Sequence, residues 1–158
     1  MMLPKVISSG ALMFCVSVLL SACTSGPQDS SSLEDFAERF REANDAENVE
    51  PMLALYELEG SSKRTISLLR NALFFELGLP IQSIEFEPLS GAPEEQISFT
   101  HQGIRYGPTL EPKLRMQVRY ATEDGLASNY TIGKNAEDNW RIVSSRPSEE
   151  PKAPTEYD

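Results

Sequence analysis

Apolar residues recur at helical spacing in the first half of the chain. The spacing i, i+3, i+4, i+7 predicts three amphipathic helices. They cover about Leu33–Ala43, Val49 to about Glu57, and a stretch that starts after Ser61 or Ser62 and stops at Gly78-Leu79-Pro80. Their apolar positions are Leu33, Phe36, Ala37 and Phe40, then Val49, Met52, Leu53 and Tyr56, then Ile66, Leu69, Leu73, Phe74 and Leu77. A capping-box pattern, Ser31 with Glu34, marks the start of the first helix.

From Ile81 onward apolar and polar residues alternate, which predicts strands. The predicted strands cover Ile81–Glu87, a piece led by Ile97 and Phe99 that Ile104 and Tyr106 continue or follow separately, Leu114–Tyr120, Leu126–Ile132 and Trp140–Ser144. Gly107-Pro108 and Pro112 are expected to interrupt pairing. Helices followed by an antiparallel meander predict an α+β fold, with three helices packed on a curved antiparallel sheet of four to six strands.

The first 22 residues have the pattern of a signal peptide. Lys5 precedes an apolar run, Val6–Leu20, whose roughly 15 residues are too few for a stable membrane span. The run ends in Leu20-Ser21-Ala22-Cys23, which resembles the lipobox of bacterial lipoproteins. The resemblance implies cleavage between Ala22 and Cys23 and attachment of lipid to Cys23. An uncleaved anchor and a plain secretory signal cleaved elsewhere are the alternatives.

Lipidation would make the membrane the first partner of this chain, because two or more acyl chains anchor a protein stably. Thr24 is not the aspartate that resembles an inner-membrane retention signal. We therefore expect the periplasmic face of the outer membrane in a Gram-negative cell. The predicted organisation is a signal peptide at 1–22, a flexible tether at 23–32, the α+β domain at 33–146 and a disordered acidic tail at 147–158.

Composition excludes several function classes. The chain has a formal net charge of −10 and only one histidine, and its two cysteines, Cys15 and Cys23, fall in the leader and at the lipid site. The acidic surface argues against binding nucleic acid, and the mature domain has no cysteine for a disulfide or a His/Cys metal site. No glycine motif for phosphate or dinucleotide binding occurs, so no cofactor is expected.

The domain resembles the NTF2-like (SnoaL-like) family. The resemblance rests on Phe36–Tyr56, where Asn44-Asp45-Ala46-Glu47 separates two helices, and on the final strand Asp138-Asn139-Trp140-Arg141-Ile142-Val143. It implies a conical pocket between sheet and helices, which some members use for a small apolar ligand and others for protein contact. The family also includes isomerases and dehydratases. The first helix offers no inward Tyr or Asp, so no catalytic site is carried over.

Candidate pocket or ligand-binding residues are Tyr56, His101, Tyr106, Arg115, Arg119 and Trp140. His101 is a candidate general base, although a lone histidine at a strand end is typically a solvated residue. Lys113, Arg115 and Arg119 alternate along one strand and could bind an anion. Cross-strand pairing with Glu85 and Glu87 is the simpler interpretation.

These patterns favour a non-enzymatic, lipid-anchored envelope protein. Its pocket or sheet face would bind a periplasmic protein or a small apolar ligand, and the open sheet face could also form a homodimer. A small isomerase or hydrolyase acting in the pocket is the alternative, and a purely structural protein without a pocket is a third. Titratable side chains converging in the cavity would favour the enzyme, whereas apolar walls would favour binding.

Overall fold

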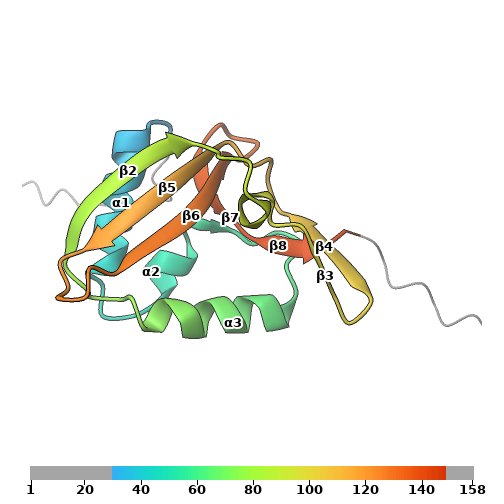
Figure 1. The fold of residues 1–158 in the computed structure, drawn as a ribbon, viewed down its shortest axis with the longest axis horizontal. Coiled ribbons are helices and arrows are strands. Elements are labelled where there is room, and N and C mark those ends of the chain that lie inside the picture. The colour runs from blue at the N-terminus through green and yellow to red at the C-terminus, as the bar shows by residue number, and fades with distance from the viewer. Residues whose placement is uncertain (1–29, 149–158) are drawn as a thin grey trace, which may run out of the picture.

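The computed structural model describes residues 30–148, which form an α+β domain (Figure 1). Its helices are α1 (Leu33–Asn44), α2 (Glu50–Leu53), α3 (Lys63–Phe74) and the short 3₁₀ helix η1 (Pro93–Gln96). Its strands are β1 (Tyr56–Glu57), β2 (Ile81–Pro88), β3 (Phe99–His101), β4 (Ile104–Pro108), β5 (Leu114–Tyr120), β6 (Ala127–Lys134), β7 (Trp140–Val143) and β8 (Ser145–Pro147).

The main sheet has five strands in the order β1-β7-β6-β5-β2, and β1 runs parallel to β7. The expected sheet was purely antiparallel and the expected second helix reached Glu57, and both predictions are wrong at Tyr56 and Glu57. Leu55 is buried, and its carbonyl oxygen accepts the N–H of Ile142 at 2.9 Å. Sheet pairing and burial therefore override a helical pattern that α2 follows for one turn.

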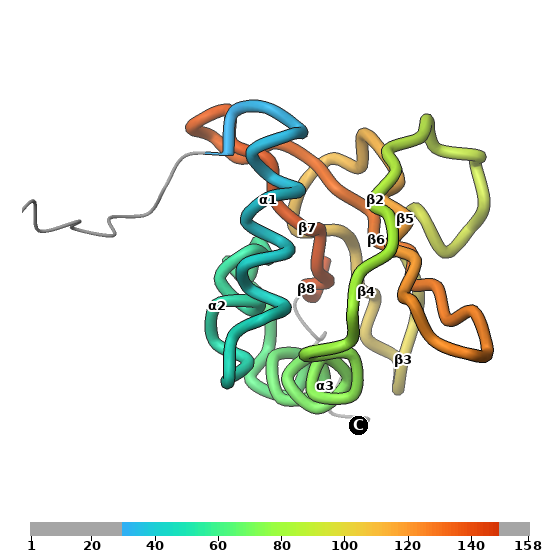
Figure 2. The backbone as a smooth tube through the Cα atoms, turned by 90° about the vertical axis from the view of Figure 1, so that its left-hand side faces the viewer, coloured from blue at the N-terminus to red at the C-terminus, as the bar shows by residue number. Residues whose placement is uncertain are grey.

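The core lies between the five-stranded sheet and the first two helices. Figure 2 shows α1 and α2 on one side of this sheet, with α3 below them. Phe36 and Phe40 of α1 are fully buried in one cluster with Met116 and Val118 of β5, where Ile132 of β6 and Ile142 of β7 also lie. The alternation predicted for β5 is confirmed, since its inward residues are buried and its polar residues face outward.

The start of the folded region includes residues that the sequence assigned to the tether. Ser30 is buried, and its carbonyl oxygen accepts the N–H of Trp140 at 2.8 Å. Ser32, rather than Ser31, caps α1, because its side chain accepts the N–H of Asp35 at 3.0 Å. The predicted signal peptide and Cys23 lie outside the described residues.

A second, three-stranded sheet has the order β3-β4-β8 and extends away from the main sheet (Figure 1). The expectations that Gly107-Pro108 would break pairing and that residues from 147 would belong to a tail are wrong here. Gly107 and Pro108 pair with Arg146 and Ser145, and β8 continues to Pro147. Proline lacks only the N–H donor, so a position at a strand end can tolerate it. Residues 149–158 lie outside the described part.

Helix α3 is much less buried than its pattern predicts. Of its residues only Leu73 is buried, whereas Leu68 and Phe74 are 60% and 71% exposed, and the adjoining Phe75 is 80% exposed. Figure 1 shows α3 running below the sheet, next to the three-stranded sheet at its first turn. One wall of a groove is therefore left open to solvent. Within residues 30–148, no helix is long and apolar enough to cross a membrane.

Candidate functional site

A groove of about 440 Å³ lies between α3 and the β3–β4 hairpin. Sites for small molecules typically enclose about 300–1,000 Å³. Ten residues line the groove: Ser62, Arg64, Thr65, Leu68, Leu69, Ala72, Phe99, His101, Tyr106 and Ser145. The set combines apolar walls with a few polar groups, which is the usual composition of a ligand site.

The helical wall follows from the periodicity of α3. Thr65, Leu68, Leu69 and Ala72 occupy positions i, i+3, i+4 and i+7, so they share one face. Ser62 fixes the beginning of this wall, because its hydroxyl oxygen accepts the N–H of Thr65 at 3.0 Å. Leu69 packs against the core, as its place on the apolar face predicts, and it also lines the groove.

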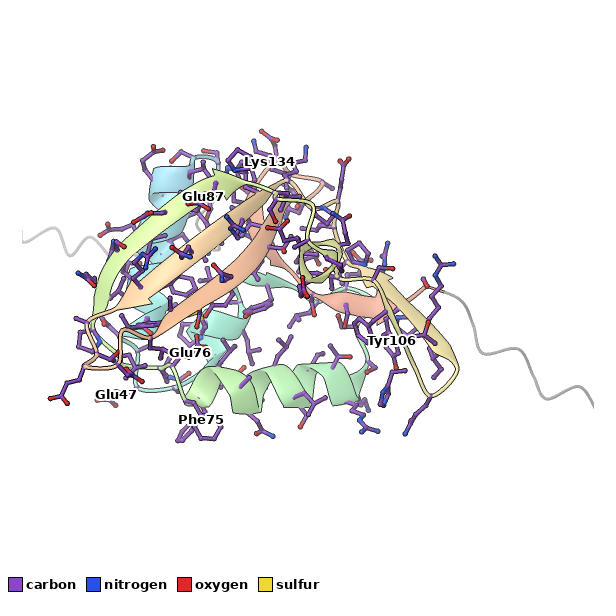
Figure 3. All side chains as sticks on the ribbon, in the orientation of Figure 1. Glu47, Phe75, Glu76, Glu87, Tyr106 and Lys134 are labelled. Carbon is purple, nitrogen blue, oxygen red and sulfur yellow. The ribbon has the colours of Figure 1, made fainter. Side chains whose placement is uncertain are left out.

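The opposite wall is the β3–β4 hairpin. Phe99 and Tyr106 are cross-strand partners, and their rings stack at 5.0 Å with an interplanar angle of 9°. The turn between the strands places Gln102 and Gly103 at positive φ, which glycine adopts without strain. Figure 3 shows Tyr106 on the side of β4 that faces α3. This stacked pair keeps an aromatic surface at the groove although Phe99 is 48% exposed.

A second cluster surrounds Glu76, directly after α3, at the lower edge of the main sheet (Figure 3). Its carboxylate accepts hydrogen bonds from the hydroxyls of Tyr120 at 3.1 Å, Ser128 at 2.8 Å and Tyr130. Burial raises the pKa of Tyr120 to about 12 and raises the pKa values of Tyr130 and Tyr56, with the nearby Glu76 charge acting in the same direction. These phenols therefore stay protonated at neutral pH. Sequence reasoning missed this cluster, because its members come from separate elements.

The Glu76 cluster joins α3 to the main sheet. Both carboxylate oxygens are occupied by hydroxyl donors from β5 and β6. None of the cluster residues lines the groove. The cluster holds the carboxyl-terminal end of α3 against the sheet and so fixes the position of the helical wall.

The predicted site residues fall in four places. His101 and Tyr106 meet at the groove, whereas Tyr56 lies near the Glu76 cluster. Trp140 lies at the other end of the domain, where the ammonium of Lys134 sits 5.3 Å from its ring centre. Arg119 is exposed on the outer face of β5. The candidate set is therefore not one site.

Arg115 confirms the simpler interpretation of the basic strand, because it pairs across the sheet. Its guanidinium contacts Glu87 on β2 and donates to Glu95 at 3.1 Å. Burial alone would raise the pKa of Glu95, but hydrogen bonds from Ser90 and Gly91 and the charge of Arg115 lower it below its usual value. The network fastens η1 to the outer face of the sheet. Arg115 therefore has a structural role, because its guanidinium pairs with two carboxylates of the same domain.

The part of the chain that the structure describes contains no candidate metal site. Within residues 30–148, no group of three or more His, Cys, Asp or Glu side chains is arranged to hold a metal ion. His101 is exposed at the groove, and no hydrogen bond or ion pair in the described region includes its ring. The groove can therefore bind and orient a ligand, but it lacks a paired acid and base.

The sequence matches no protein-family model, and comparison with curated proteins and with solved structures gives no match either.

Removing the Glu76 carboxylate should destabilise the domain. We expect Glu76→Ala to lower the free energy of unfolding by about 1–3 kcal/mol, because partly buried hydroxyls lose their acceptor. Glu76→Gln, which keeps one acceptor oxygen, should have an intermediate effect. Glu47→Ala, an exposed carboxylate removed from a loop, is the control and should change stability by less than about 0.5 kcal/mol. Urea unfolding measures the stability of all three variants. Equal effects of Glu76→Ala and Glu47→Ala would show that the Glu76 hydrogen bonds do not hold α3 against the sheet.

Proposed function

We propose that this chain is a non-enzymatic, lipid-anchored envelope protein whose domain binds a small apolar ligand in the groove between α3 and β3–β4. One observation carries the binding function: Leu68 and Phe99 are large, apolar and exposed on facing walls of one hollow. Contiguous exposed apolar surface of this kind marks interaction sites. A ligand between the walls would remove both side chains from water.

The domain arrangement supports an NTF2-like fold as part of this proposal. Helices α1 and α2 precede the first strand and cover one face of the main sheet, α3 follows β1, and the cavity lies beside α3. The resemblance implies a pocket between helices and sheet, and the groove lies next to that space, with α3 as one wall and the β3–β4 hairpin of the second sheet as the other. The exposed apolar groove favours a small ligand over catalysis, because His101 faces it without a partner acid or base.

The envelope location is supported by the sequence of the leader. A basic residue, an apolar run and Leu20-Ser21-Ala22-Cys23 follow one another in the order that a lipoprotein leader requires. Thr24 favours the periplasmic face of the outer membrane. The membrane is then the partner of the lipid, and the groove remains free for a ligand in the periplasm.

Filling the groove tests the binding function. Nile red, a neutral apolar dye, should bind to the chain from residue 23 onward carrying Cys23→Ser, with a rise in fluorescence. Ala72→Trp places an indole in the groove, and we expect dye affinity to fall at least about tenfold, a loss of about 1.4 kcal/mol. Asn71→Trp adds the same side chain at the neighbouring exposed position of α3, outside the lining, and should bind normally.

Thermal unfolding of each variant checks that the fold is intact. Unchanged dye binding by folded Ala72→Trp would overturn the proposed function, and so would equal losses in Ala72→Trp and Asn71→Trp. The lipid anchor is not needed in this experiment, because the hydrophobic core lies within the described residues.

A further inference from the structure

We infer that the ligand of the groove is a free fatty acid, with its chain between the apolar walls and its carboxylate at Arg64 and His101. This inference rests on the proposed binding function and adds the chemical class of the ligand. It follows from the way polar and apolar residues divide along the groove, and from the absence of acidic residues in its lining.

The polar residues gather at one end. Arg64 belongs to the first turn of α3, and His101 is the last residue of β3, next to the hairpin turn. Both line the groove. Figures 1 and 2 show the hairpin beside α3, and Figure 1 places the first turn of α3 at the end nearest to it. A guanidinium and an imidazole N–H at this end can both donate hydrogen bonds to one carboxylate.

The apolar residues continue from that end. Leu68, Leu69 and Ala72 follow Arg64 along the helix, and the stacked rings of Phe99 and Tyr106 line the same groove. From Ser62 to Ala72 the helix advances about 15 Å at its usual rise. A single extended acyl chain fits an elongated groove of this kind, and each buried methylene contributes about 0.8 kcal/mol to transfer from water.

Charge selects the head group. None of the ten lining residues is acidic, although the whole chain carries 24 Asp and Glu against 14 Lys and Arg. Arg64 and His101 take part in no ion pair within residues 30–148, whereas Arg70 and Arg115 of the same domain are paired. Lys63 directly precedes Arg64 in the first turn of α3 and adds a second positive charge to that turn. A cationic amphiphile would be repelled here, and a neutral one would leave the guanidinium without a counter-charge.

A charge series on one chain length tests the head group. Laurate, 1-dodecanol and dodecyltrimethylammonium are compared at pH 7 by displacement of Nile red from the Cys23→Ser chain, below the micellar concentrations of the two ionic compounds and below the solubility limit of the alcohol. Laurate should displace the dye at a concentration at least about tenfold lower than 1-dodecanol, because a hydrogen bond to a charged group adds affinity. The ammonium compound should displace it least.

Two variants locate the carboxylate. Arg64→Gln should weaken laurate about tenfold and leave 1-dodecanol unchanged, since only the charged head meets the guanidinium. Arg119→Gln, which removes an exposed cation from the outer face of β5, is the matched control and should leave both affinities unchanged. A second readout, direct calorimetric titration of laurate, guards against dye artefacts.

The outcomes separate this inference from the proposed function. Equal binding of laurate and 1-dodecanol, both lost in Ala72→Trp, would overturn the fatty acid and leave an apolar ligand site. Failure of all three amphiphiles and of Nile red would overturn both.

Discussion

Replacing Gly133 by alanine should lower the free energy of unfolding by about 2–4 kcal/mol, through overpacking of a site without room. Gly133 is buried in β6, opposite Arg141 of β7. An added Cβ would lie well inside 3.0 Å of the carbonyl oxygen of Glu111, a separation that real Cβ atoms essentially never show. The obstacle is backbone, held in place by the bond from Lys113 N–H to the carbonyl oxygen of Ile132 at 2.9 Å, so it cannot rotate away.

The chain provides a matched control for this substitution. Gly107 is also a strand glycine without a positive φ, but a Cβ there would meet only the Ser148 side chain at an ordinary 3.5 Å. We expect Gly107→Ala to change stability by less than about 1 kcal/mol, measured with Gly133→Ala by urea unfolding. A Gly133→Ala protein as stable as Gly107→Ala would mean that the carbonyl oxygen of Glu111 does not lie against Gly133 of β6.

Local patterning was sufficient where an element buries one face against a partner that covers it fully. Helix α1 and strand β5 follow their predicted periodicities because Phe36, Phe40, Met116 and Val118 all meet in one core. In such elements the period of the pattern and the burial agree. The α+β class could therefore be predicted from the order of the elements.

Patterning failed where long-range pairing decides the conformation. Tyr56 continues the spacing of α2, but a parallel neighbour 86 residues further on makes it a strand. Ser145–Pro147 have a tail-like composition, yet β4 supplies their pairing partner. No local signal in either segment identifies such a partner, because the partner lies far away in sequence. The mixed sheet and the second sheet could not be predicted for this reason.

The groove was predicted only in part, for the same physical reason. His101 and Tyr106 were candidates, and both line it, but of the helical wall only Leu69 was named, as part of the apolar face of the helix. An amphipathic pattern shows that one face of a helix is apolar and does not show what covers that face. Helix α3 has Leu73 in the core and Leu68 exposed. Only the position of the β3–β4 hairpin distinguishes a ligand site from a core contact.

Replacing Cys23 by serine should abolish the lipid anchor, the largest functional effect that we expect from one substitution. The sulfur of Cys23 would carry the diacylglyceryl group, and the hydroxyl of serine cannot replace the thiol as the acceptor of that lipid. One acyl chain binds a bilayer only marginally at about 0.8 kcal/mol per buried methylene, whereas two or more chains hold a protein stably. Loss of the chains should therefore move the mature domain out of the detergent phase almost completely.

Intact-mass spectrometry and detergent-phase partition measure this result. The mature wild-type chain should begin at Cys23 and be heavier than its polypeptide by the attached acyl chains, and Cys23→Ser should lack this mass. Cys15→Ser, a change of the other cysteine within the predicted leader, is the matched control and should leave mass and partition unchanged. A wild-type mass equal to that of the bare polypeptide would refute the anchor. The proposed ligand groove would be unaffected by that result, because the core and the groove lie within residues 30–148.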